Sequence, residues 1–351
     1  MTRTALFSAL VLAFVVAGGI LHFADANAVA IFVVTGVALG GVAWTIGIAT
    51  ESVGARYGPA VTGALQSTLG NLPELFIVLF ALAAGELVVA QFAILGSLFA
   101  NALLVLGLAI TVGALRSPGG MMRFGPRLPN DTATLLLLAV FIIALLGASD
   151  LAGDAASDNQ LAISVVGAVL LLAVYGAWLF AYLRAEVRSE RALEEPAHGV
   201  LPFAFALALL AGSGISAAFV SDWFVEAIDP AVEELGISKA FTGLVIVAIA
   251  GNAVENVVAV QLAAKQKHDL AVSVVKNSVA QIACFLWPVL ILASLLFTQQ
   301  LTFVVAPVYV GALVLMALAV WQITGDGEAA FFEGTALVAL YLVLATIVWF
   351  E

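Results

Sequence analysis

The most constraining feature of this sequence is a series of apolar stretches of about twenty residues, separated by glycines, prolines and charged residues. A helix of that length spans the hydrocarbon core of a lipid bilayer. The chain of 351 residues is also 64% hydrophobic and only 10% charged, which excludes a soluble globular domain. We therefore predict an all-α membrane protein with about eleven transmembrane helices. Their expected limits are 4–23, 28–50, 58–83, 87–115, 132–149, 160–184, 199–221, 236–264, 269–297, 302–323 and 330–350.

The basic residues predict the orientation of these helices. When the helices alternate in direction, ten of the twelve lysines and arginines fall on the side of the N-terminus. These ten are Arg3, Arg56, Arg116, Arg123, Arg127, Arg184, Arg188, Arg191, Lys265 and Lys267. Because loops rich in lysine and arginine stay in the cytoplasm, we expect a cytoplasmic N-terminus and a C-terminus outside, in a prokaryotic plasma membrane. The first apolar stretch, followed by Ala24-Asp25-Ala26, also fits a cleaved secretory signal.

Composition excludes several other classes of protein. The net charge of −11 leaves no basic patch for nucleic acid. The single cysteine, Cys284, allows no intrachain disulfide and no cysteine-based metal cluster. We expect no cofactor and no nucleic-acid partner. The expected partners are inorganic cations and the lipid bilayer, and the sequence leaves a homo-oligomer open.

Two matching motifs lie inside the apolar stretches, Gly70-Asn71-Leu72-Pro73-Glu74 and Gly251-Asn252-Ala253-Val254-Glu255. A shift of 181 positions carries the first motif onto the second, and it also carries Ser97 onto Ser278. We interpret this match as an internal duplication. Because each copy holds five helices, the second copy enters the membrane from the opposite side, as in the inverted repeats of secondary transporters.

This duplication predicts the organisation of the whole chain. An N-terminal transmembrane helix occupies 1–27, and the two five-helix repeats occupy 28–184 and 199–351. A charged cytoplasmic linker over 185–198 joins the repeats.

The two motifs place carboxylates at membrane depth, where a charged group is costly and marks an ion or proton site. Asn71 and Glu74 are three residues apart and share a helical face. Pro73 has no N–H, so the carbonyl of Leu69 loses its helical partner and joins the carboxylate as an oxygen ligand of the kind that Ca²⁺ prefers. Asn252, Glu255 and the carbonyl of Ala250 are the corresponding groups of the second copy. Val254 replaces the proline there, which predicts a milder break.

Further polar residues follow each motif in the next apolar stretch. Ser97 and Asn101 share one helical face, and Ser278 and Gln281 share another. Such groups either join helices by hydrogen bonds or line a polar path for the ion. Lys276 lies on the opposite face from Ser278 and Gln281, and we expect it to extend toward the cytoplasmic end, outside the site.

The paired motifs, with Leu95-Gly96-Ser97 and the run from Asn101 to Gly107 after the first, resemble the signatures of calcium/proton exchangers. These exchangers are a branch of the calcium/cation antiporter superfamily. The resemblance implies two inverted five-helix repeats whose glutamates, Glu74 and Glu255, alternately bind Ca²⁺ or protons. The sequence departs from this family at two positions, since Asn256 stands where His is usual and Asn277 where Gly is usual.

The sequence thus predicts a secondary-active antiporter, rather than an enzyme, that exports Ca²⁺ in exchange for H⁺ by alternating access. Two carboxylates carry a charge of −2, which one Ca²⁺ or two protons neutralise. Exchange of Na⁺ for H⁺ or for Ca²⁺ is the alternative within transport. A cation channel and an intramembrane enzyme are the alternatives from other classes, and no set of residues typical of an intramembrane hydrolase is evident in the sequence.

Overall fold

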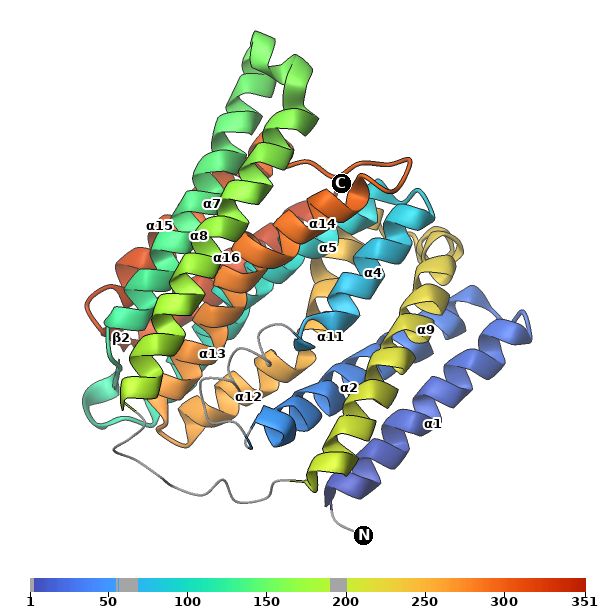
Figure 1. Cartoon of the computed structure of the whole chain (residues 1–351), viewed down its shortest axis with the longest axis horizontal. Helices are drawn as coiled ribbons and strands as arrows, with labels where there is room; N and C mark the ends of the chain where they lie inside the picture. The colour runs from blue at the N-terminus through green and yellow to red at the C-terminus, as the bar shows by residue number, and fades with distance from the viewer. Residues whose placement is uncertain (1–2, 55, 57–68, 190–200) are drawn as a thin grey trace.

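The computed structural model describes residues 3–54, 56, 69–189 and 201–351, and these residues are almost entirely helical (Figure 1). The helices of the first half are α1 (Arg3–Phe23), α2 (Ala28–Gly54), α4 (Leu72–Ala83), α5 (Leu87–Phe99), α6 (Leu106–Leu115), α7 (Arg127–Ala152) and α8 (Gln160–Ser189). Those of the second half are α9 (Phe203–Leu235), α10 (Lys239–Phe241), α11 (Ala248–Gly251), α12 (Ala253–Ala264), α13 (His268–Gln281), α14 (Trp287–Ser294), α15 (Pro307–Thr324) and α16 (Phe331–Trp349).

Shorter elements connect or interrupt these helices. Three π-helical segments, η1 (Ala100–Val105), η5 (Thr242–Val247) and η6 (Ile282–Leu286), lie within longer helical stretches. Two short 3₁₀ helices, η2 (Pro118–Gly120) and η3 (Ala155–Asn159), lie in connections. Strands β1 (Met121–Arg123) and β2 (Glu328–Ala330) pair antiparallel, with Met122 opposite Ala329.

Nine helical stretches of the described residues are long and apolar enough to span a bilayer, and the bent pair α10–α12 makes a tenth. This confirms an integral membrane protein that is nearly all helical. Each stretch overlaps an expected one, and of the expected stretch 58–83 residues 58–68 lie outside the described part. Residues 185–189 of the expected linker over 185–198 belong to α8, which continues to Ser189. The rest of the linker lies outside the described residues.

One helix is longer than the stretch that the sequence predicted for it. The stretch expected at 199–221 belongs to α9, which continues to Leu235 and contains Pro230. The acidic residues of its last turns do not break the helix, which ends where Gly236 adopts a left-handed conformation (φ 65°).

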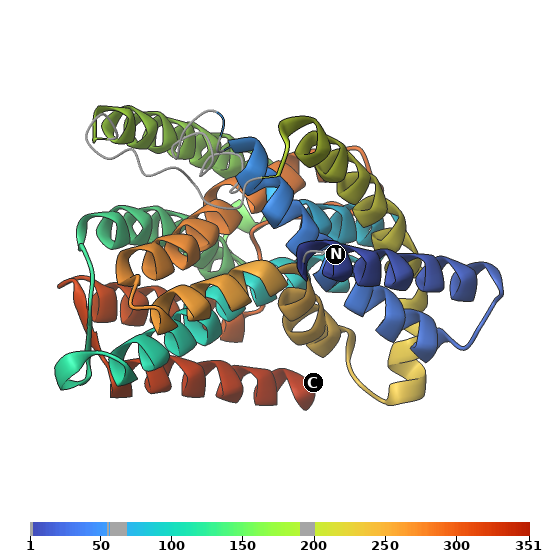
Figure 2. The same cartoon turned by 90° about the horizontal axis from the view of Figure 1, so that it is seen from below.

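The packing surrounds two central helical stretches. The continuous stretches α5–η1–α6 and α13–η6–α14 are the most buried of the candidate spans. Helix α9 packs along α2 and α4, and α2 in turn packs against α11 and α12. Figures 1 and 2 both place α1, α2 and α9 on one side of the molecule and α7, α8 and α15 on the other.

Helix boundaries in the two halves obey the same shift as the sequence motifs. Helices α4 and α12 begin at Leu72 and Ala253 and end at Ala83 and Ala264, in each case 181 positions apart. Helices α5 and α13 begin at Leu87 and His268, and η1 and η6 end at Val105 and Leu286, again 181 positions apart. The shift therefore relates local structure as well as sequence.

Candidate ion-binding site

Both motifs interrupt their helices at the asparagine. Asn71 has φ −92° and ψ 15°, and Asn252 has φ −101° and ψ 21°, so neither continues the α-helix. A new helix starts directly after each, and α11 and α12 are bent by 58° relative to each other. The expectation of a milder second break without proline stays a prediction, because residues 57–68, which precede the first break, lie outside the described part of the chain. Gly251 weakens the helix, and the Asn252 side chain donates to the carbonyl of Ala248 (2.9 Å), so proline is not required.

The first carboxylate is fully enclosed. Glu74, in the first turn of α4, has an exposed fraction of 0%. Neither of its carboxylate oxygens has a hydrogen-bond partner among the described residues, although the Ser97 hydroxyl lies beside the group. A buried carboxylate without partners is costly and requires a bound cation or a proton.

The second carboxylate lies near the first. Glu255, in the first turn of α12, interacts electrostatically with Glu74, and its Oε2 is buried with no hydrogen-bond partner in the described ranges. A side chain at Gly251 would meet the Cβ of Glu74 at 3.7 Å, so the break of the second motif lies against the glutamate of the first. The structure thus brings Glu74, Glu255 and Gly251 to one place.

Three polar side chains form a hydrogen-bonded chain between the halves. Asn101 Nδ2 donates to Asn252 Oδ1 (2.9 Å), and Asn252 Nδ2 donates to Ser97 Oγ (2.8 Å). The carbonyls of Ser97 and Ala248 accept from the same two Nδ2 atoms, which fixes the orientation of both amides. Asn101 Oδ1 remains buried and unbonded in the part of the chain that the structure describes.

Ser278, the counterpart of Ser97, and the polar residues near it in the second half make no such chain among the described residues. Ser278 Oγ, Asn256 Oδ1 and Asn277 Oδ1 are buried without hydrogen-bond partners among the described residues. Gln281 is buried as well, with an exposed fraction of 2%. These oxygens are therefore free to bind a cation or a proton donor.

The remaining predicted ligands are the two carbonyls before the breaks. Leu69 is helical and directly precedes Gly70, and Ala250 lies in α11. The Ala250 carbonyl faces α2, since a side chain at Gly40 would meet it at 3.7 Å. For Leu69, the structure describes no contact that tests its predicted role.

One neighbour of the site was missed by the sequence reasoning. Ser221 of α9 is fully buried, and its hydroxyl lies 3.5 Å from the carbonyl of Pro73, next to the first break. The shift of 181 positions relates Gly40 to Ser221, so each break faces the equivalent position of an equivalent helix. Applying the shift to apolar helices as well as to the motifs identifies this residue.

Lys276 lies in α13 but takes no part in these contacts. Its side chain is buried, and Nζ donates to the hydroxyl of Thr324 (3.3 Å) at the end of α15. Lys276 therefore bonds a hydroxyl of α15 rather than a predicted ion ligand. The expected extension toward the cytoplasmic end was wrong, because the side chain is buried. The hydroxyl and the negative end of the α15 dipole supply a partner within the protein.

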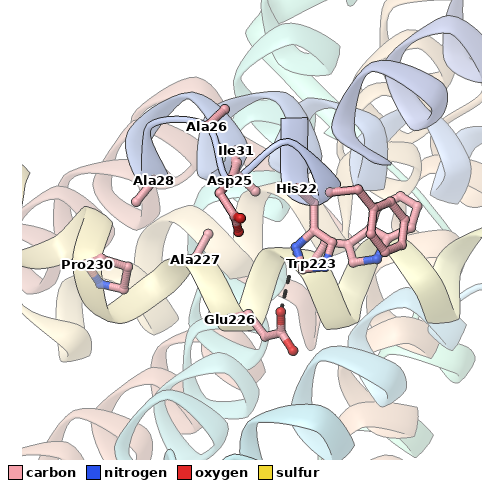
Figure 3. A pocket seen from close by; sticks show the side chains of 10 residues that line it. His22, Asp25, Ala26, Ala28, Ile31, Trp223, Glu226, Ala227 and Pro230 are labelled. Atoms are coloured by element: carbon pink, nitrogen blue, oxygen red, sulfur yellow. Dashed lines mark ion pairs between the residues drawn. The ribbon is translucent and has the colours of Figure 1, made fainter. Parts of the chain in front are cut away.

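A cavity elsewhere is separate from these residues. It has a volume of about 390 Å³ and lies between the end of α1 and α9, with Trp223 on its wall (Figure 3). His22 Nδ1 is 3.6 Å from a carboxylate oxygen of Glu226 at its edge. None of the predicted ion ligands lines this cavity.

Comparison with known proteins identifies the family. The model of the sodium/calcium exchanger protein family matches residues 27–184 and 205–350. The chain belongs to this family. Both motifs and both asparagine breaks lie within the matched residues.

The similar proteins of this family are named as transporters. The Ca²⁺/H⁺ antiporter of Aphanothece halophytica is 30% identical, covering 94% of this chain and 92% of that protein. The Ca²⁺/H⁺ antiporter ChaA of Bacillus subtilis is 32% identical, covering 94% of each. Relatives of the calcium/proton exchanger branch therefore match nearly the whole chain, which confirms the resemblance inferred from the motifs.

Solved structures of similar proteins have the same fold as this chain. The structure of native YfkE has a TM-score of 0.83 at 29% identity, covering 98% of this chain and 100% of that chain. The H⁺/Ca²⁺ exchanger CAX has a TM-score of 0.78 at 14% identity, covering 98% of this chain and 89% of that one, which shows that the fold is shared.

Proposed function

We propose that this protein is a secondary-active antiporter that exports Ca²⁺ in exchange for H⁺ by alternating access. The observation that carries the proposal is the pair of glutamates, Glu74 and Glu255, whose buried oxygens lack hydrogen-bond partners among the described residues. The two carboxylates carry −2, which one Ca²⁺ or two protons neutralise. The names of the similar proteins, Ca²⁺/H⁺ antiporters, support the same cargo.

The coordination follows from which oxygens are free. The carboxylates of Glu74 and Glu255 bind the cation or the protons. Asn101 Oδ1 and Ser278 Oγ are buried and unbonded among the described residues, so they complete the oxygen shell that Ca²⁺ requires. We assign Asn71, Gln281 and the carbonyls of Leu69 and Ala250 as further oxygen donors that can join this core during the transport cycle.

Asn252 and Ser97 act differently in the conformation seen here. The amide of Asn252 is occupied on both sides, by Asn101 and by Ser97. Ser97 Oγ accepts from Asn252, so its own proton is free for the neighbouring Glu74 carboxylate. These two residues therefore orient Glu74 and reach the cation only when the hydrogen-bonded chain opens.

Coupling of the two fluxes follows from charge. A site neutralised by one Ca²⁺ or by two protons crosses the low-dielectric part of the protein far more cheaply than an empty site with two negative charges. The empty site cannot change sides, so each outward movement of Ca²⁺ requires a return with protons. Lys276 points away and leaves the site at −2, which favours Ca²⁺ over Na⁺.

The architecture that we propose is one N-terminal helix over 1–27 and two inverted five-helix repeats over 28–184 and 199–351, joined by the linker 185–198. The matching helix boundaries of the two halves support it. The N-terminus is cytoplasmic and the C-terminus outside, in a prokaryotic plasma membrane. Single cysteines at 117–127 and 152–156, in a Cys284→Ser background, test the orientation. Labelling of the first set from the cytoplasm and of the second from outside is expected, and the reverse contradicts it.

The cargo is tested with the purified protein in sealed vesicles. A pH gradient is imposed, and uptake of Ca²⁺ and of Na⁺ is measured in separate experiments. Ca²⁺ uptake that follows the pH gradient, with Na⁺ unmoved, is the expected result. Uptake of Na⁺ alone, or Ca²⁺ conductance without proton movement, contradicts the proposal.

A further inference from the structure

The two halves of the site differ in their hydrogen bonds, although the shift of 181 positions makes their residues equivalent. Asn252 of the second half donates to Ser97 of the first. The equivalent bond joins Asn71 to Ser278, and it is absent among the described residues, since Ser278 Oγ has no partner and Asn71 makes no side-chain cap bond. The structure thus records one of two symmetry-related arrangements.

The equivalence of the halves defines the other arrangement. In a transporter built of inverted repeats, exchanging the conformations of the repeats gives the state that faces the opposite side of the membrane. In that state, called here the mirror state, Asn71 bonds Ser278 and Asn252 releases Ser97. This step rests on the proposed function.

The two arrangements differ in one further hydrogen bond. Asn101 donates a second bond to Asn252 (2.9 Å), but the shift carries Asn101 onto Ile282, which has no side-chain donor. The nearest amide, Gln281, corresponds to Ala100 and lies about 100° around the helix from Ile282. The mirror state therefore lacks the counterpart of the Asn101–Asn252 bond.

We propose that Asn101 is a positioning residue that biases the Ca²⁺-free, proton-loaded transporter toward the conformation seen here, through a hydrogen bond that the mirror state cannot form. Asn101 is fully buried, so water does not replace the lost bond. One net hydrogen bond changes an equilibrium constant roughly twofold to tenfold. The bias sets the side of the membrane on which the proton-loaded site rests.

Hydrogen exchange of the full-length protein, purified in detergent at mildly acidic pH with a calcium chelator, tests the bias. Backbone amides at 248–256 report the second break, and those at 69–75 report the first. We expect Asn101→Ile to speed exchange at 248–256 and to slow it at 69–75, by roughly twofold to tenfold, because the mirror state protects the first break. A merely structural defect does not slow exchange at 69–75. Faster exchange at both breaks, or no change at either, overturns the proposal.

Two further variants keep the test independent of how well Asn101→Ile folds. Ser278→Ala removes a hydroxyl that is unbonded here among the described residues, and it weakens only the mirror state. It should speed exchange at 69–75, whereas Ile282→Asn, which supplies the missing donor, should slow it. Ile282→Val is the matched control and leaves both breaks unchanged. Slower hydrogen exchange at 69–75 in Ser278→Ala, or faster hydrogen exchange there in Ile282→Asn, overturns the proposal.

The outcome separates this proposal from the proposed function. Hydrogen exchange without Ca²⁺ measures conformation and requires no transport. Absence of Ca²⁺/H⁺ flux in wild-type vesicles overturns the antiporter. Ca²⁺/H⁺ flux in wild-type vesicles, together with hydrogen exchange that is unchanged in Asn101→Ile, overturns only the bias.

Discussion

Asn252 Nδ2 donates a 2.8 Å hydrogen bond to Ser97 Oγ, joining residues that are 155 positions apart in the chain. The bond connects the break of the second motif to the helix that follows the first motif. Asn101 strengthens the same connection from η1. The candidate ion site is therefore held together by contacts between the two halves, and neither half contains it alone.

The Asn252 side chain should be more important for stability than that of Asn71. Asn252→Leu leaves Ser97 Oγ and Asn101 Nδ2 with unmet hydrogen bonds in a buried place, at a cost of about 1–3 kcal/mol for each unsatisfied group. Asn71 makes no side-chain cap bond among the described residues, so Asn71→Leu is the matched control with a smaller loss. Thermal unfolding in detergent measures both. Equal losses, or a larger loss for Asn71→Leu, contradict the described network.

Gly96 is required where α5 crosses η5. A Cβ at Gly96 would lie 2.3 Å from the carbonyl oxygen of Leu244, which is backbone and cannot move aside cheaply. Gly96→Ala should therefore lower stability by about 1–3 kcal/mol through overpacking. Gly176→Ala in α8 is the control, because its Cβ meets nothing within 4 Å in the described structure. Similar melting temperatures for the two variants argue against this crossing.

Lys276 should be dispensable for the choice of ion. Its Nζ bonds Thr324 rather than a carboxylate, so Lys276→Met removes a buried amine while keeping most of the side-chain volume. Burying an amine with a single neutral partner is costly, so the melting temperature should hold or rise when an apolar group replaces it. Ca²⁺ uptake should persist and Na⁺ uptake should not appear, as measured in sealed vesicles. A reversal of the Ca²⁺ and Na⁺ preference in Lys276→Met places the lysine in the site.

Much of this fold was predictable because the bilayer imposes strong constraints. The length of the apolar stretches predicts where helices span, and the matched Gly-Asn-x-x-Glu motifs indicate where the helices break. Glu74, Asn252, Ser97 and Asn101 converge because charged and polar groups at membrane depth require partners.

Other features depend on tertiary contacts that the sequence does not encode locally. The π-helical segments arise where helices pack closely, as at Gly96 and Leu244, and no residue pattern predicted them. Helical periodicity indicated that Lys276 faces away from the site, but its burial depends on where α15 ends. The direction of the hydrogen bonds around Asn252 depends on which conformation the protein adopts.

The paired carboxylates are tested most directly by measuring Ca²⁺ and proton movements simultaneously in vesicles that contain wild type, Glu74→Gln or Glu255→Gln. The amide keeps the shape of the carboxyl group but carries no charge to exchange. The wild type should move Ca²⁺ and protons in opposite directions, more weakly for Ca²⁺ as the pH falls on the Ca²⁺ side, because protons compete for the same oxygens. Each variant should lose both movements while keeping the wild-type elution profile and melting behaviour. Wild-type Ca²⁺/H⁺ exchange in either variant would contradict the account.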